Sequence, residues 1–250
     1  MSDNAIYILF ASIIQGLTEF LPISSSGHLI ILKDIFNINV KNLNFEIMLH
    51  LGTVFSVIVY YKRDILDIIN QSKNNNHTNL FLIIIGCIPI AIIGFLSKNF
   101  IELYFNDISL LPYSFMLTSI FLFLTQYVNG KNQLTLKIVL IVGLLQTLAL
   151  LPGISRSGIT ISSLLLLGIN QKDAIKFSFL MAVPLILGAS LLTVNLIEIS
   201  YLHFTGIIVS FIFGWIAIYL TENLLQNKKY WMFSFYCFII SILTFIWSPN

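Results

Sequence analysis

Two polar interruptions in an otherwise apolar chain decide how it can fold: LPISSSGH at residues 21–28 and LPGISRSG at residues 151–158. Pro and Gly break a helix, so each interruption divides an apolar segment into two arms. The arms of the second segment, 138–151 and 159–169, are each too short to cross a bilayer at about 1.5 Å per residue. The first segment has the same organisation, with a short second arm to about Asn37. We therefore expect two re-entrant helical hairpins with irregular tips at mid-depth in a membrane.

The composition independently places the chain in a membrane. Of its 250 residues, 57% are hydrophobic and only 10% are charged, and the mean hydropathy is +0.91. An ordinary soluble domain has about 25% charged residues. The chain has too little polar surface to cover a globule in water, which excludes a soluble enzyme and a disordered chain. The net charge of +2 gives no basic face, which excludes nucleic acid as a partner.

Six further apolar stretches are long enough to cross a bilayer as helices, which takes about 17–25 residues. Polar segments, which we expect to be loops, separate these stretches from one another, notably at 62–79, 129–137 and 227–229. The expected fold class is therefore all-α integral membrane, with six transmembrane helices plus two re-entrant helical hairpins in a single membrane domain, 1–250. The six predicted spans are 45–61, 80–96, 110–128, 177–197, 205–226 and 230–247.

The two interruptions also mark an internal repeat. The first, QGLTEFLPISSSG at 15–27, is matched by QTLALLPGISRSG at 146–158. Each half then contains one hairpin and three spans, so the first repeat covers about 1–128 and the second about 130–250. Because three spans reverse the chain, the repeats would have inverted topology. The two tips would then approach from opposite faces and meet near the midplane, as in many transporters.

The distribution of Lys and Arg sets the expected orientation. Nine lie in the loops on one predicted side, three lie on the other side, and Arg156 completes the 13. The positive-inside rule makes the side with nine cytoplasmic and places both termini outside. The nine are Lys62, Arg63, Lys73, Lys131, Lys137, Lys172, Lys176, Lys228 and Lys229, and the three are Lys33, Lys41 and Lys98.

Ionisable residues within apolar segments are candidate functional groups, because a charge at mid-bilayer costs about 2.5–3.5 kcal/mol. Glu19, His28 and Arg156 lie at or beside the two interruptions. Gln15 and Glu19 are four residues apart and share one helix face. Ser25 and His28 project to one side if the second arm begins a helix there.

Both interruptions have the sequence signature of a helix N-terminus, in which a Ser caps free backbone N–H groups. Such an N-terminus binds anions through these N–H groups and the positive end of the helix dipole. Arg156 adds a planar guanidinium, which can donate two parallel hydrogen bonds to a phosphate. We therefore predict a strongly anionic ligand such as a diphosphate. The predicted binding groups belong to Ser24, Ser26, Gly27, Ser155, Ser157 and Gly158.

Structural roles remain open for several of these residues. Glu19 and Arg156 are also compatible with a buried ion pair that only supports the fold. Individual serines are compatible with hydrogen bonding between helices in lipid. For His50 a structural role is preferred, and for Glu46 a dipole partner at a helix N-terminus is as well supported as a functional role. Glu222 is expected to face the cytoplasmic interface.

The two quoted motifs closely resemble the signature motifs of the undecaprenyl-diphosphatase family, the bacitracin-resistance or BacA-type integral membrane phosphatases. FSFLMAVP at 177–184 and the FE and LG pairs at 45–46 and 51–52 are also similar to family segments. The resemblance implies hydrolysis of undecaprenyl diphosphate to undecaprenyl phosphate and inorganic phosphate in the plasma (inner) membrane of a bacterium. This reaction recycles the lipid carrier for peptidoglycan synthesis, and so serves cell-wall biogenesis, cell shape and antibiotic resistance.

The resemblance also implies site residues. It adds Thr160 to the substrate-binding set, and it implies a divalent cation, expected to be Mg²⁺. Glu19, with help from Gln15, would bind this cation or orient His28. Because Gln15 stands where the family motif has Glu or Gln, only Glu19 can carry a charge there. Ser25 is then the candidate nucleophile and His28 the base or leaving-group acid, with Glu19 and Arg156 as further catalytic residues.

Two alternatives stay open alongside this interpretation. Water, activated by His28, could attack the diphosphate directly without a phosphoserine. The chain could instead be a lipid-phosphate carrier, a flippase, because inverted repeats suit transport equally well. The expected partners are a polyprenyl diphosphate lipid and the bilayer, and a homodimer is left open.

Overall fold

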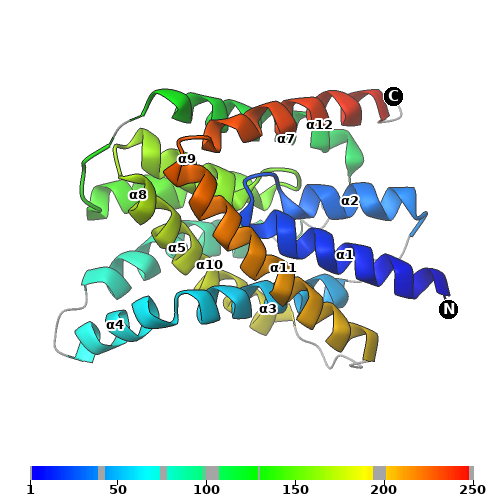
Figure 1. Ribbon diagram of the computed structural model, residues 1–250, viewed down its shortest axis with the longest axis horizontal. Coiled ribbons are helices and arrows are strands. Elements are labelled where there is room, and N and C mark those ends of the chain that lie inside the picture. The colour runs from blue at the N-terminus through cyan, green and yellow to red at the C-terminus, as the bar shows by residue number, and fades with distance from the viewer. Residues whose placement is uncertain are drawn as a thin grey trace.

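The structure is a computed structural model that describes residues 2–38, 43–73, 78–97, 99, 107–128, 130–193 and 201–247. Every named element in these ranges is a helix, which agrees with the predicted all-α class (Figure 1). Five sequence predictions fall partly or wholly outside the described residues. These are the loop residues Lys41 and Lys98, positions 74–77 of the predicted loop 62–79, the repeat boundary at 129, and positions 194–197 of one predicted span.

Five helices of the described chain have the length and apolar composition of membrane spans, and they match five of the six predicted spans. The chain is therefore a multi-pass membrane protein. The helices are α5 (Thr78–Leu96), α7 (Leu111–Leu124) flanked by η1 (Ile108–Leu110) and η2 (Thr125–Tyr127), α10 (Gln171–Thr193), α11 (Tyr201–Gln226), and α12 (Phe233–Trp247) preceded by η4 (Tyr230–Met232).

The sixth predicted span is the helix α3 (Leu43–Tyr60), and it continues into a second helix, α4 (Lys62–Lys73). The chain bends by 72° between the two helices. The prediction of a polar loop over 62–79 is therefore wrong for most of that segment. Its Ile65 and Ile68, three residues apart, pack against the hydrophobic core and support a helix along the bundle.

The two predicted pairs of short arms are present, and both breaks fall at the predicted Pro-containing positions. The arms are α1 (Ser2–Phe20) with α2 (Ser25–Ile35), and α8 (Leu136–Leu145), extended by η3 (Gln146–Leu150), with α9 (Arg156–Leu166). Both α2 and α9 have 11 residues, and the apolar parts of the preceding arms are also shorter than the five spans. The local chemistry of Pro and Gly accounts for this organisation.

Helices of the two halves pack against each other extensively. The first-half helix α1 packs along α11, α3 packs on both α10 and α11, and α7 lies beside α12 (Figure 1). This packing brings the break between α1 and α2 next to the break between η3 and α9, although the two are far apart in the sequence.

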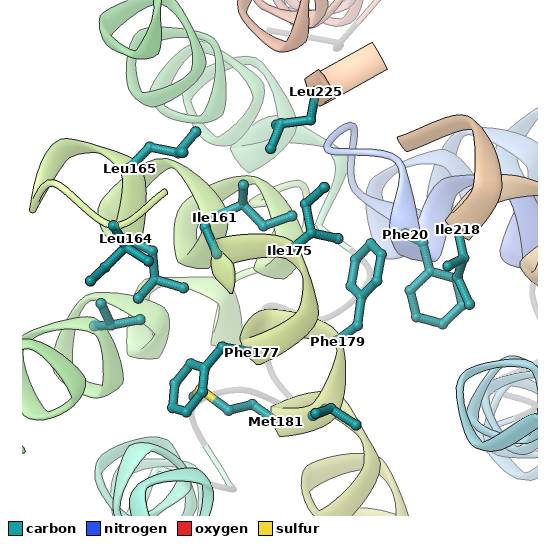
Figure 2. Close-up of a cluster of buried hydrophobic side chains, with 14 of the residues drawn as sticks. Phe20, Ile161, Leu164, Leu165, Ile175, Phe177, Phe179, Met181, Ile218 and Leu225 are labelled. Carbon is teal, nitrogen blue, oxygen red and sulfur yellow. The ribbon is translucent and has the colours of Figure 1, made fainter. Parts of the chain in front are cut away.

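The largest core cluster lies directly beside these breaks (Figure 2). Phe20, the last residue of α1, is fully buried and contacts Phe179 of α10 edge to face, with ring centroids 5.0 Å apart. Ile161 of α9, Ile175 of α10 and Ile218 of α11 belong to the same cluster. The core therefore holds the end of α1 and the start of α9 in fixed positions.

Candidate active site

The first break presents two polar side chains of α1 and a capped helix start. Gln15 and Glu19 are both buried, and the Gln15 Nε2 donates to Glu19 Oε2 over 3.0 Å, as their predicted common helix face allows. Ser24 caps α2, because its Oγ accepts a hydrogen bond from the backbone N–H of Gly27 over 3.3 Å. The predicted helix N-terminus at this motif is confirmed.

The second break contains the matching cap. The Oγ of Ser155 accepts a hydrogen bond from the backbone N–H of Gly158 over 3.0 Å at the start of α9. Before it, Gly153 has a φ of +88°, and a Cβ at this position would lie 2.7 Å from the Cβ of Ser114 on α7. Only glycine fits this close, left-handed turn without strain.

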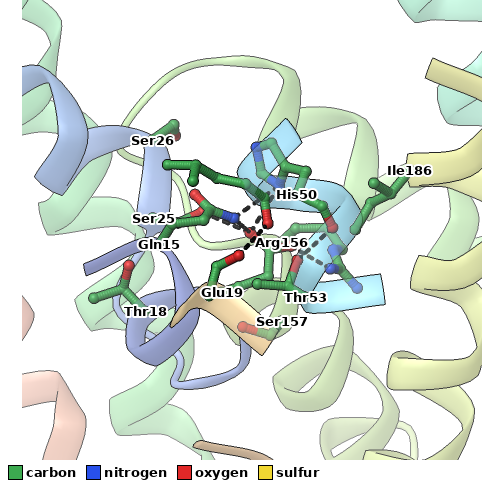
Figure 3. A network of polar contacts seen from close by, with 12 residues as sticks. Gln15, Thr18, Glu19, Ser25, Ser26, His50, Thr53, Arg156, Ser157 and Ile186 are labelled. Carbon is green, nitrogen blue, oxygen red and sulfur yellow. Dashed lines mark hydrogen bonds and ion pairs between the residues drawn. The ribbon is translucent and has the colours of Figure 1, made fainter. Parts of the chain in front are cut away.

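The two breaks meet, as the sequence repeat predicts (Figure 3). Arg156 Nη2 donates to Glu19 Oε1 over 2.6 Å, and the two atoms form an ion pair between the halves. The Ser157 hydroxyl donates to the backbone oxygen of Leu21 over 3.2 Å. A third, longer contact of 3.4 Å runs from the backbone N–H of Gly153 to the hydroxyl of Ser26.

One carboxylate organises this cluster. The Ser25 hydroxyl donates to Glu19 Oε2 over 2.7 Å. The Glu19 carboxylate therefore accepts hydrogen bonds from a hydroxyl, an amide and a guanidinium. The side chains of Glu19 and Arg156 are only 7% and 14% exposed, so neither charge is fully hydrated. Breaking such a buried pair from one side costs about 3–5 kcal/mol. The pair therefore contributes to the fold whatever else it does.

His28 contacts groups outside this cluster. Its Nδ1 donates to the backbone oxygen of Ser24 over 2.7 Å, which leaves Nε2 to accept from the Tyr236 hydroxyl over 2.6 Å. The two rings are also stacked, with centroids 5.7 Å apart. Both nitrogens therefore have partners other than Ser25, and the geometry does not place His28 as its base.

A different imidazole, that of His50 on α3, enters the cluster. Its Nδ1 lies 2.8 Å from the Nε2 of Gln15 and 3.4 Å from Glu19 Oε2. Sequence reasoning preferred a structural role for His50, because no spacing connects it to the two motifs. The only available signal was a His within an apolar span.

The remaining predicted binding residues support the geometry around Arg156. The Thr160 hydroxyl contacts the Arg156 backbone oxygen over 2.8 Å and the Ser178 hydroxyl over 2.6 Å, which joins α9 to α10. Arg156 Nη1 donates to the Ser178 backbone oxygen over 3.4 Å. The hydroxyl of Ser157 lies 3.2 Å from that of Ser155. The guanidinium is thus held at two of its nitrogens.

Two further acidic groups, Glu46 and Glu222, have their partners outside this cluster. Glu46 forms an ion pair with Lys33 of α2, so this lysine is bound to the helix bundle. Glu222 of α11 accepts hydrogen bonds from the hydroxyls of Tyr60 and Tyr61, at the bend between α3 and α4. Neither carboxylate contacts the Glu19 cluster in these pairings.

The residues present fit the implied divalent cation. Gln15 Oε1 is buried and has no hydrogen-bond partner among the described residues, so an acceptor oxygen is left over beside the Glu19 carboxylate. No group of three or more His, Cys, Asp or Glu side chains in the described ranges forms a metal cage. Mg²⁺ binds through one or two carboxylates together with substrate phosphates and water, and needs no such cage.

Fold and site together define a class, a multi-pass helical membrane protein whose polar centre lies where two broken helical segments meet. The family model described as "Bacitracin resistance protein BacA" matches residues 8–243, and the chain belongs to this family. The resemblance of its two motifs to the family's signature is thereby confirmed.

Several relatives match over nearly their whole length. The "Undecaprenyl-diphosphatase" of Thermosipho africanus is 40% identical over 240 residues, which cover 93% of this chain and 96% of the relative. The protein of the same name from Methanococcus maripaludis is 38% identical over 248 residues, covering 95% and 99%. That from Pelagibacter ubique is 38% identical over 257 residues, covering 98% of both chains.

Proposed function

We propose that this protein hydrolyses undecaprenyl diphosphate to undecaprenyl phosphate and inorganic phosphate, the activity named in its relatives. The observation that carries the proposal is the buried cluster in which the Ser25 hydroxyl and the Arg156 guanidinium share the Glu19 carboxylate. A hydroxyl on a carboxylate supplies a nucleophile, and a guanidinium supplies charge stabilisation for a phosphoryl group.

In the proposed reaction Ser25 Oγ forms a bond to the terminal phosphorus, while the bond from that phosphorus to the bridging oxygen breaks. The hydroxyl proton passes to Glu19 Oε2, which already accepts it over 2.7 Å. Undecaprenyl phosphate leaves with the bridging oxygen. Water then forms a bond to the phosphorus of the phosphoserine while the bond from phosphorus to Ser25 Oγ breaks. Inorganic phosphate leaves with the water oxygen, and Glu19 returns its proton to Ser25 Oγ.

Arg156 and the backbone N–H groups at the starts of α2 and α9 would stabilise the negative charge of the transferred phosphoryl group. Phosphoryl transfer depends mainly on such positioning and charge neutralisation. In this scheme Glu19 takes the role that sequence analysis gave to His28, because His28 is bound to Ser24 and Tyr236.

Direct attack by water is the competing mechanism, and one experiment separates the two. Rapid quenching with lipid labelled in its terminal phosphate traps a phosphorylated Ser25 if the covalent route operates. Full activity of Ser25→Ala, with no labelled protein, overturns the covalent route.

For the divalent cation, Glu19 and the free Oε1 of Gln15 are the proposed protein ligands. When bound, Mg²⁺ would supply positive charge to the diphosphate oxygens. Removal of the ion with a chelator should abolish phosphate release, and Gln15→Leu should raise the Mg²⁺ concentration needed for half-maximal rate.

The arrangement in the membrane is part of the same proposal. We propose that the α1–α2 and α8–α9 pairs are re-entrant hairpins of inverted repeats and that both termini lie outside. The contact between the breaks and the nine-to-three division of Lys and Arg support it. Labelling of single cysteines at either terminus by an impermeant reagent in intact cells tests the orientation.

The decisive test of function is phosphate release by purified protein in detergent. Detergent abolishes vectorial transport but leaves hydrolysis intact, so release that depends on Ser25 supports the diphosphatase. Movement of lipid phosphate in vesicles without any release in detergent would instead identify a carrier.

A further inference from the structure

The position of His50 within the cluster defines which of its nitrogens carries the proton. Gln15 Nε2 faces the Glu19 carboxylate, which can only accept hydrogen bonds while ionised in its pair with Arg156. This contact fixes the orientation of the Gln15 amide, with its NH₂ group toward both Glu19 and His50.

An amide NH₂ has no acceptor capacity, so the 2.8 Å contact requires His50 Nδ1 to accept. A neutral imidazole that accepts at Nδ1 carries its hydrogen at Nε2. The two hydrogens of the Gln15 amide are then both used, one by Glu19 and one by His50. Nε2 of His50 is left as a donor.

His50 is the most exposed of the three ionisable side chains in the cluster. The His50 side chain is 31% exposed, against 7% for Glu19 and 14% for Arg156. Among the described residues, no hydrogen-bond partner reaches Nε2 of His50. Figure 3 shows that His50 reaches the network from α3, a different helix from those that supply Glu19 and Arg156.

We propose that His50 is a further substrate-binding residue of this site, whose neutral Nε2–H donates a hydrogen bond to a phosphoryl oxygen of the diphosphate. The proposal rests on the proposed function for the identity of the ligand. It assigns His50 the substrate-facing role among the imidazoles, since His28 is occupied by Ser24 and Tyr236.

Two amide variants distinguish the role of His50 Nδ1 from that of Nε2. In His50→Gln the side-chain amide nitrogen reaches the place of Nε2 and preserves the outward donor. In His50→Asn the shorter amide reaches only the place of Nδ1, where its oxygen can accept from Gln15. Neither amide titrates, so the comparison is independent of protonation.

We expect His50→Asn to lower kcat/KM for undecaprenyl diphosphate about 10–100-fold, the effect of one hydrogen bond to a charged group, and His50→Gln to stay within about 5-fold of wild type. Apparent melting temperatures in detergent should be the same for both. Retained activity in His50→Asn, or equal losses with lowered melting temperatures in both variants, would overturn the proposal by assigning His50 a structural role.

A binding measurement separates this inference from the proposed function. Inorganic pyrophosphate is titrated into each protein in detergent with Mg²⁺ present. The inference expects weaker binding, by about 10-fold or more, in His50→Asn only. This result would stand even if the wild-type protein released no phosphate, whereas equal binding by both variants and wild type contradicts it.

Discussion

The two breaks share the same backbone organisation but present different chemical groups. Each starts an 11-residue helix with a serine cap, Ser24 at α2 and Ser155 at α9. The residue directly after the cap is Ser25 in the first break and Arg156 in the second. Equivalent positions therefore present a hydroxyl from one half and a guanidinium from the other. Neither half has both, so the proposed reaction requires their contact.

The glutamines that precede the breaks differ in the same way. Gln15 donates to Glu19 and His50 within the cluster, whereas Gln146 Nε2 donates to the backbone oxygen of Gly86 over 2.6 Å. The first glutamine therefore contacts ionisable side chains, and the second joins η3 to α5. A repeat in the sequence thus identifies equivalent backbones, but it does not assign equivalent functions.

The largest expected effect comes from removing the proposed nucleophile of the first break. Ser25→Ala should lower the rate of phosphate release at least about 10³-fold, because no other hydroxyl replaces the one on Glu19. Release is measured with undecaprenyl diphosphate in detergent. Ser12→Ala is the matched control, since Ser12 is buried in the same helix as Glu19 and, within the described part of the chain, its hydroxyl bonds only to the Ile8 backbone oxygen. Equal losses in both variants would assign the effect to the fold.

The equivalent position in the second break gives the next largest effect. Arg156→Lys keeps the positive charge but cannot reach both Glu19 and the Ser178 backbone oxygen, which two guanidinium nitrogens contact. We expect kcat to fall about 10²-fold, with a smaller change in apparent melting temperature. Near-wild-type turnover would show that a point charge is sufficient at this position.

The parts of the structure that sequence predicts well are those fixed by local chemistry. Pro and Gly determine where the arms break, and Ser24 and Ser155 determine where α2 and α9 begin. The repeat adds one non-local prediction, that the breaks meet, and the pair of Glu19 with Arg156 confirms the contact.

Contacts between distant helices were not predictable in this way. His28 is on the expected helix, but its ring is oriented by Tyr236, 208 residues away. His50 joins the cluster only because α3 packs beside α1, and α4 exists because Ile65 and Ile68 reach the core. Spacing within a motif carries no information about such neighbours.

Close packing of both breaks on α7 gives a third, stability-based comparison. A Cβ at Gly27 would lie 2.6 Å from the ring of the buried Phe115 and 2.9 Å from the Cα of Gly153, whereas one at Gly153 would lie 2.7 Å from the Ser114 Cβ and would also require a φ of +88°. We therefore expect Gly153→Ala to destabilise by about 1–3 kcal/mol, more than Gly27→Ala. The yield of monodisperse protein and its apparent melting temperature measure this.

Gly188 provides the control for these substitutions. A Cβ there meets none of the described residues within 4 Å, so Gly188→Ala should be neutral or slightly stabilising. If Gly188→Ala lowered the melting temperature as much as Gly153→Ala, steric fit at the break would not be the cause.

The smallest expected effect concerns the two serine caps. Substitution by glycine should change the apparent melting temperature in opposite directions at the two positions. Ser24 has a φ of +67°, which is strained for a residue with a Cβ, whereas Ser155 has an ordinary φ of −74°. Replacing a serine cap by glycine costs a few tenths of a kcal/mol. At position 24 relief of strain worth about 1–3 kcal/mol outweighs that cost, so Ser24→Gly should raise the apparent melting temperature. At position 155 only the cap and chain entropy change, so Ser155→Gly should lower it. A decrease in both variants would show that the Ser24 hydroxyl, through Gly27 and Ser26, contributes more than its backbone strain costs.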